Sequence, residues 1–146
     1  MRNSLDGTDV KIFINSFRGA TNECMKSYLV PSHKYKPDLY ILHSGTNDLS
    51  SKQSPQDIAE NLFKLAMNLK DNENNVIISG LIFRNDKLNE KAKSVNEILN
   101  NLCVKSDIHF NDNSNITKYH LNGSGLHLNY DGTTALARNY LRCIRL

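Results

Sequence analysis

Three short segments of the sequence contain residue types that could catalyse acyl transfer. Gly19 follows one apolar run, Gly45-Thr46-Asn47-Asp48 follows a second, and His127 stands between two leucines before the last amphipathic segment. A glycine amide and an asparagine side-chain amide can donate hydrogen bonds to a developing oxyanion, and a loop histidine can act as a general base. Together these segments predict acyl-transfer chemistry.

Each of these residues also has an ordinary structural interpretation. Gly19 can be a turn glycine that needs a positive φ. Asn47 and Asp48 can form an Asx turn or a helix cap, and His127 can be a half-buried structural histidine. Spacing typical of metal ligands is absent among the other histidines, His33, His43, His109 and His120. The sequence therefore predicts neither a metal nor a cofactor.

An open parallel sheet would bring the three segments together, because its reactive loops lie at the carboxyl ends of the strands. Short β-rich runs alternate with longer helical stretches along the chain, which is typical of an α/β domain. We predict four parallel strands, near residues 10–15, 38–43, 76–83 and 108–110. With helices on both faces, they form a three-layer α/β/α domain.

Amphipathic helices are predicted between and after the strands. One begins at Ser54, whose side chain can accept from free backbone amides, and Pro55 suits its first position. Apolar residues recur at helical spacing over residues 58–69, 88–102 and 133–144. Each of these stripes can cover one face of the sheet.

The composition favours one globular domain over residues 1–146, because 39% of the residues are hydrophobic and 23% are charged. No apolar run approaches the roughly 20 residues that cross a bilayer, which excludes the membrane class. The net charge of +3 is scattered without a basic stripe, so no nucleic-acid footprint stands out. Buried free thiols of an intracellular reducing compartment, such as the cytoplasm, are predicted for Cys24, Cys103 and Cys143.

The order and spacing of the three segments resemble the SGNH hydrolase family, also called GDSL-like lipases and esterases. Residues 17–21 (FRGAT) resemble the glycine block of that family, and residues 37–48 (PDLYILHSGTND) resemble its G-x-N-D block. Residues 125–129 (GLHLN), with Gly132, resemble the block of the catalytic histidine. The resemblance covers nearly the whole chain and implies a flavodoxin-like sheet and a small-molecule ester substrate.

The resemblance implies a role for each matching residue. His127 would be the general base, and Gly19 and Asn47 would donate hydrogen bonds to the oxyanion beside the amide of the nucleophile. Ser124 stands where the family usually has an acid, three residues before the histidine. A neutral hydroxyl can accept a hydrogen bond from imidazole but cannot stabilise imidazolium as a carboxylate does.

The nucleophilic serine of the family, in a G-D-S block that ends its first strand, has no counterpart in this sequence. Asn3-Ser4-Leu5 does not replace it, because no apolar run precedes Ser4 to form a strand. In the family that strand lies in the middle of the sheet, so we expect a central strand to be missing too. We therefore expect a domain that is incomplete at its N-terminus, from a gene fragment or a degenerate copy, with an evolved pseudoenzyme as the alternative.

Three classes of function follow. The first is hydrolysis of a carboxylic ester by descent, with this chain inactive or severely impaired because it lacks the serine that forms the covalent intermediate. The second is a non-catalytic binding module that keeps the crevice and has lost the chemistry. The third, an accessory domain of a mobile-element protein acting on nucleic acid, ranks last because the chain has no basic stripe. The oligomeric state is not readable from the sequence.

Overall fold

The computed structural model describes residues 2–5, 8–17 and 19–144, with a parallel three-stranded sheet at its centre. The sheet contains β3 (Leu39–Leu42), β4 (Asn75–Ser79) and β5 (His109–Asn111), in that order. Residues 76–79 of β4 are all buried, as expected for a middle strand covered on both faces. The strands predicted near residues 38–43, 76–83 and 108–110 are confirmed.

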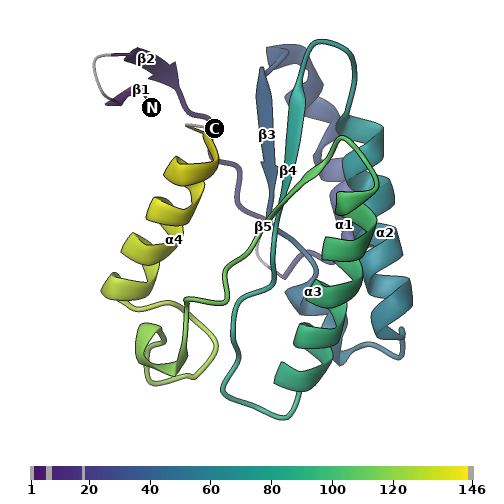
Figure 1. Ribbon diagram of the computed structural model, residues 1–146, viewed down its shortest axis with the longest axis vertical. Coiled ribbons are helices and arrows are strands. Elements are labelled where there is room, and N and C mark those ends of the chain that lie inside the picture. The colour runs from purple at the N-terminus through teal and green to yellow at the C-terminus, as the bar shows by residue number, and fades with distance from the viewer. Residues whose placement is uncertain (1, 6–7, 18, 145–146) are drawn as a thin grey trace.

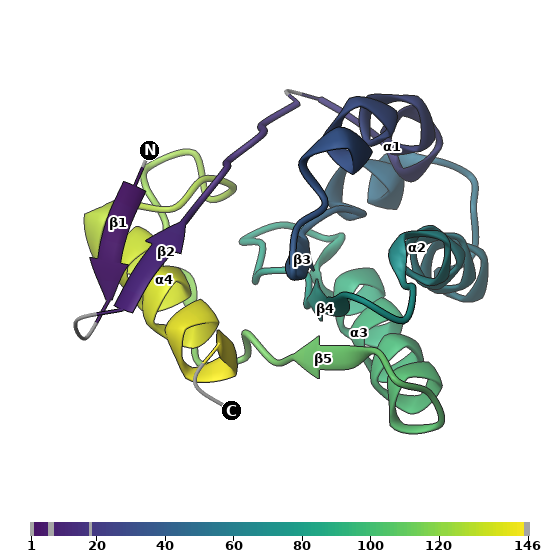
Figure 2. The same ribbon diagram turned by 90° about the horizontal axis from the view of Figure 1, so that it is seen from above.

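Helices lie on both sides of this sheet. Figure 2 shows α2 (Pro55–Leu69) and α3 (Asn89–Val104) on one side and α4 (Tyr130–Ile144) on the other. The remaining helix is α1 (Asn22–Tyr28), and short 3-10 helices span Val30–Tyr35 (η1), Thr46–Ser50 (η2) and Lys118–His120 (η3). The predicted α/β/α architecture is confirmed. No helix in the described part of the chain is long and apolar enough to cross a bilayer.

The start of α2 follows from its sequence. The Ser54 side chain accepts from the Asp57 amide at 3.0 Å, and the Asp57 carboxylate accepts from the Ser54 amide at 3.4 Å. Pro55 occupies the first helical position, where no amide hydrogen is needed. The apolar face then enters the core, which includes Ile58, Leu62, Leu65, Val76, Ile78, Val95 and Leu99.

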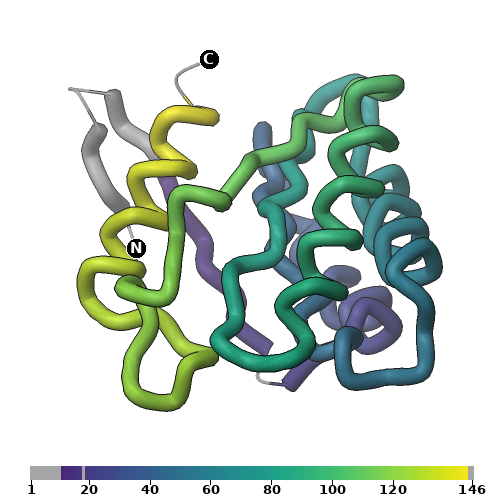
Figure 3. Tube along the Cα trace, turned by 60° about the horizontal axis from the view of Figure 1, so that its bottom comes forward, coloured from purple at the N-terminus to yellow at the C-terminus, as the bar shows by residue number. Residues whose placement is uncertain are grey.

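The prediction of a parallel strand near residues 10–15 is wrong. Thr8–Lys11 (β2) instead pairs antiparallel with Arg2–Leu5 (β1) in a separate sheet. Two strands that are close in the sequence pair at a lower cost of loop closure than distant strands do. Figure 3 follows residues 11–17 from near α4 to the start of α1, and in this segment Phe13 and Ile14 are 57% and 74% exposed.

The hairpin also corrects the expectation that no strand forms around Ser4, although the side chain of Ser4 lies outside the described residues. The hairpin stands apart from the parallel sheet, in which β3 occupies one edge. Among the described residues no strand pairs with the free edge of β3, as expected for a sheet without the first strand of the family.

All three cysteines are free thiols, as predicted. Cys103 is buried and Cys143 is half-buried, whereas Cys24 is exposed. The expectation of burial is therefore wrong for Cys24, which lies on the solvent side of the short helix α1. Burial raises the pKa of the Cys103 thiol to about 11.

Candidate functional site

The loops that follow the parallel strands meet at one end of the sheet. Figure 1 shows the loop after β4 and the loop before α4 together at the lower end of the view. Residues 45–48 follow β3 directly and open the 3-10 helix η2. Among the described residues, no three His, Cys, Asp or Glu side chains are grouped so that they could hold a metal ion.

Gly19 and Asn47 lie in neighbouring loops. Asn47 Nδ2 donates to the Ala20 carbonyl at 2.9 Å, which holds the side chain beside the turn at Gly19. A side-chain amide has two N–H groups, so Asn47 can donate to one more acceptor. Gly19 has a φ of +71°, and a Cβ there would meet no atom within 4 Å, so backbone conformation rather than crowding requires glycine. The structure thus places the two predicted oxyanion donors in adjoining loops.

The loop after β4 connects the histidine loop to the loop that contains Asn47. The Asn85 amide donates to the Gly125 carbonyl at 2.9 Å, and Arg84 Nη1 donates to the Thr46 carbonyl at 3.4 Å. The side chain of His127 is exposed and does not point into the core. His127 therefore lies at the same end of the sheet as Asn47, and its role as a general base stays a prediction.

Ser124 shapes its own loop. Its Oγ donates to Asn122 Oδ1 at 2.5 Å and accepts from the amides of Leu126 and His127 at 3.2 and 3.3 Å. These bonds engage the hydroxyl with the polypeptide backbone and Asn122 rather than with the imidazole. Within the described residues the His127 ring has no hydrogen-bond partner, so nothing orients it as the family's acid would.

Asp48, the last residue of the G-x-N-D block, has a structural role. Asp48 as a residue is 1% exposed, and its carboxylate accepts from the Asn22 amide at 3.1 Å, at the start of α1. Burial raises the pKa of this carboxyl group, against the lowering effect of the Asn22 bond. Asn22 in turn accepts from the Ser44 hydroxyl at 2.8 Å. Asp48 therefore joins η2 to the first turn of α1, whose own N-cap is Thr21.

The sequence analysis missed a polar cluster between the sheet and α4. His43 Nδ1 lies 2.8 Å from Ser79 Oγ, which lies 3.0 Å from Tyr140 OH and accepts from Asn113 Nδ2 at 2.9 Å. Ser79 is fully buried, whereas His43 as a whole residue is exposed. Partial removal from water lowers the pKa of the His43 imidazole, and it raises the pKa of the Tyr140 hydroxyl. A usable signal was the polar residue at the carboxyl end of each strand.

Comparison with known proteins gives a match over most of the chain. The family model described as GDSL-like Lipase/Acylhydrolase matches residues 4–139. No curated protein sequence matches. Solved structures with a similar fold share less than 25% identity with this chain. They therefore establish its fold and not its activity.

Solved structures that are similar to this chain include the following three. The lipase/acylhydrolase from Enterococcus faecalis has a TM-score of 0.72 at 18% identity, covering 86% of this chain and 71% of that one. A GDSL-like lipase from Bacteroides thetaiotaomicron has a TM-score of 0.74 at 16% identity, with coverage of 87% and 72%. A catalytic mutant of an acetylxylan esterase from Geobacillus stearothermophilus has a TM-score of 0.71 at 16% identity, with coverage of 85% and 67%.

Proposed function

Because the chain belongs to the family of GDSL-like lipases and acylhydrolases, we propose that its site derives from a serine esterase and hydrolyses small carboxylic esters only marginally. The observation that supports this proposal is the hydrogen bond that holds the Asn47 amide beside the turn at Gly19. The histidine loop lies at the same end of the sheet, tied to the site through Asn85 and Gly125. These groups suit an ester carbonyl, and the sequence contains no G-D-S block to attack it.

In this proposal, water is the nucleophile. His127 takes a proton from water as the oxygen attacks the ester carbonyl, and the Gly19 and Asn47 amides donate to the oxyanion that forms. The intermediate then collapses, and the imidazolium returns the proton to the departing alkoxide. Without a carboxylate beside His127 or a serine nucleophile, the acceleration is far below that of a complete triad. Triads stripped of a member retain on the order of 10³-fold over water.

The first prediction concerns hydrolysis of p-nitrophenyl acetate by the purified chain. We expect a rate only slightly above that of the His127→Ala variant, because a base and an oxyanion hole remain while the covalent step is lost. His109→Ala is the matched control, since His109 is an exposed histidine at the start of β5. A rate unchanged by His127→Ala, or lowered equally by His109→Ala, would contradict the role of His127.

A fluorophosphonate probe tests the missing nucleophile directly, because it forms a covalent bond with activated serines. We expect no stoichiometric labelling of the chain. A labelled serine, located by mass spectrometry, would overturn the claim that the chain lacks a nucleophile.

Adding an upstream apolar strand that ends in Gly-Asp-Ser should raise both hydrolysis and labelling. A folded variant of this kind without either gain would contradict the roles given to His127 and Asn47.

A second candidate, ligand binding without catalysis, is favoured by one observation. Ser124 is engaged with Asn122 and backbone amides, and the described structure gives His127 no orienting partner. Such a module would bind an ester-like molecule without cleaving it. Equal ester hydrolysis by the natural chain and the His127→Ala variant, together with saturable binding of the amide p-nitroacetanilide, would favour this function over marginal hydrolysis.

A further inference from the structure

The loop that contains His127 also contains the dipeptide Asn122-Gly123, which takes no part in the proposed hydrolysis. Both residues are exposed, and the dipeptide occurs once in the sequence. Asparagine is a thermolabile residue, because the backbone nitrogen that follows it can attack the carbon of its side-chain amide. A following glycine hinders this attack least, since it has no Cβ and moves freely about φ and ψ.

Two hydrogen bonds from Ser124 polarise the side-chain amide of Asn122. The Ser124 amide donates to Asn122 Oδ1 at 2.9 Å, and the Ser124 hydroxyl donates to the same oxygen at 2.5 Å. When a nucleophile attacks Asn122 Cγ, this oxygen becomes negatively charged, and hydrogen bonds to an oxyanion are stronger than those to a neutral carbonyl. The two donors therefore stabilise the transition state of the attack more than the ground state.

The nucleophile and the leaving group are not engaged in other bonds. The bond from the Ser124 amide to Asn122 Oδ1 closes an Asx turn, and the ring of this turn includes the Gly123 nitrogen. Within the described residues the Gly123 amide donates to no acceptor, and neither does Asn122 Nδ2. Because Cγ and the attacking nitrogen belong to one short ring, the attack is unimolecular.

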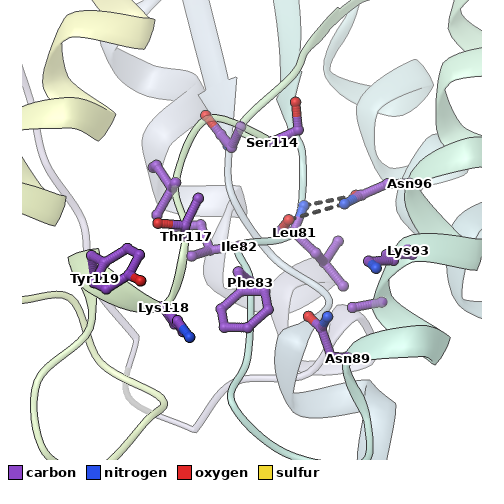
Figure 4. Close-up of a pocket in the computed structure, with 13 residues that line it drawn as sticks. Leu81, Ile82, Phe83, Asn89, Lys93, Asn96, Ser114, Thr117, Lys118 and Tyr119 are labelled. Atoms are coloured by element: carbon purple, nitrogen blue, oxygen red, sulfur yellow. Dashed lines mark hydrogen bonds between the residues drawn. The ribbon is translucent and has the colours of Figure 1, made fainter.

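Asn96 shows the opposite arrangement. Its Oδ1 accepts from the Leu81 amide at 2.8 Å and its Nδ2 donates to the Leu81 carbonyl at 2.9 Å, as the dashed lines in Figure 4 mark. The next residue is Glu97, whose amide lies inside α3 and is held by the hydrogen bonds of the helix. The side chain that would be attacked and the nitrogen that would attack are both held in place at Asn96.

We propose that Asn122 undergoes spontaneous deamidation promoted by Ser124. The Gly123 nitrogen attacks Asn122 Cγ and loses its proton to solvent. The bond from Cγ to Nδ2 breaks, and Nδ2 takes up a proton and leaves as ammonia. Water then opens the succinimide ring at either carbonyl, which yields aspartate or isoaspartate at position 122. The reaction uses only water, and it does not depend on the proposed ester hydrolysis.

Deamidation changes the loop that contains His127. The Asn122 amide donates to the His127 carbonyl at 2.7 Å, and the Asn122 carbonyl accepts from the Gly125 amide at 3.0 Å. Aspartate keeps this backbone and adds one negative charge, whereas isoaspartate directs the main chain through Cγ. The former Asn122 carbonyl then becomes a side carboxylate, so the bond from Gly125 loses its geometry. The reaction therefore alters the charge of the loop in one product and its backbone in the other.

The test is peptide mapping by mass spectrometry of the folded full chain, incubated at physiological temperature and pH. We expect conversion at Asn122 to be about tenfold faster than at Asn96 or at Asn15, an exposed asparagine followed by serine. Transfer of a methyl group by protein isoaspartate methyltransferase should detect isoaspartate at position 122. Conversion of Asn122 no faster than that of Asn15 would overturn the proposal.

Four variants separate the contributions to the rate. Asn122→Gln should abolish detectable conversion, because its longer side chain would have to close a six-membered ring. Gly123→Ala should slow conversion about fivefold by restricting the backbone, and its Cβ meets no atom within 4 Å, so the chain should still fold. Ser124→Ala should slow conversion about tenfold, less than the loss of a donor from a buried oxyanion hole. Ser124→Thr retains a hydroxyl and should retain the rate.

Ser114→Ala, at an exposed serine outside this loop, is the matched control for Ser124→Ala and should leave the rate unchanged. Circular dichroism checks that each variant is folded. Equal conversion in folded Ser124→Ala and Ser114→Ala chains would contradict the role of Ser124. The hydrolysis of p-nitrophenyl acetate is measured on fresh samples. Loss of hydrolysis with conversion of Asn122 intact would refute the proposed function alone, and hydrolysis without conversion would refute the deamidation site alone.

Discussion

Asp48 supports the site from inside the protein without contact with a substrate. Its carboxylate accepts from the backbone of Asn22 and, at 3.5 Å, from Gln53 Nε2. The following loop is thereby held against α1, and Asn47 is held beside Ala20. Two residues of the G-x-N-D block therefore differ in role. Asn47 is an exposed hydrogen-bond donor, and Asp48 is a buried acceptor.

We predict that Asp48→Ala lowers the free energy of unfolding by about 1–3 kcal/mol, because the Asn22 amide loses its acceptor in a buried position. Urea denaturation measures the change. Asp48→Asn should cost less, since its side-chain oxygen can still accept from Asn22. Asp107→Ala, at an exposed carboxylate, is the control and should change the stability little. Equal losses for Asp48→Ala and Asp107→Ala would show that the carboxylate does not support the loop.

At the scale of the elements, close packing at the start of α4 explains why a glycine occupies position 132. A Cβ on Gly132 would collide with the His120 carbonyl oxygen and would lie 2.9 Å from Leu128 Cδ2. The Gly132 amide donates to Asn129 Oδ1 at 2.9 Å, so Asn129 caps the helix at this point. Gly132 therefore permits close packing of α4 against η3, next to the histidine loop.

Gly132→Ala should destabilise the protein by about 1–3 kcal/mol, as expected when extra volume is forced into a packed contact. Thermal unfolding followed by circular dichroism measures the loss. Gly123→Ala is the matched control, because a Cβ at Gly123 meets no atom within 4 Å. We expect its midpoint to stay within the error of the natural chain. A Gly132→Ala midpoint as high as that of Gly123→Ala would contradict the close contact.

At the scale of the whole molecule, the protein contains two sheets that differ in strand pairing and in burial. β4 pairs with strands on both sides and is covered by the core, whereas β1 and β2, within the described part of the chain, pair only with each other. A two-stranded hairpin alone is marginally stable in water. The local stability of the protein is therefore expected to fall from the parallel sheet to the hairpin.

Amide hydrogen exchange should reveal this gradient. The amides of β4 from Val76 to Ile78 should exchange only on global unfolding, and those of β1 and β2 should exchange by local opening, many times faster. Mass spectrometry of peptic peptides measures both in one sample, so the two sheets serve as controls for each other. Hairpin amides protected as strongly as those of β4 would show that the two sheets unfold together.

The sequence by itself determined the elements whose signals are local. The cap at Ser54 and the apolar spacing after it specify α2, because capping and helical periodicity act between residues a few positions apart. The apolar run at Val76 likewise specifies the buried strand β4. Order and spacing of the motifs also identified the family, which the match over residues 4–139 confirms.

The tertiary structure decided what depends on distant partners. Val10 belongs to a hairpin rather than to the main sheet, because an apolar β-rich run does not specify which strand it pairs with. Ser79 meets His43 across 36 positions and Tyr140 across 61, so no local pattern predicts their cluster. The partner of the Ser124 hydroxyl was also undetermined, since competing acceptors lay within its own loop. Such contacts follow from packing, which brings together residues that the sequence separates.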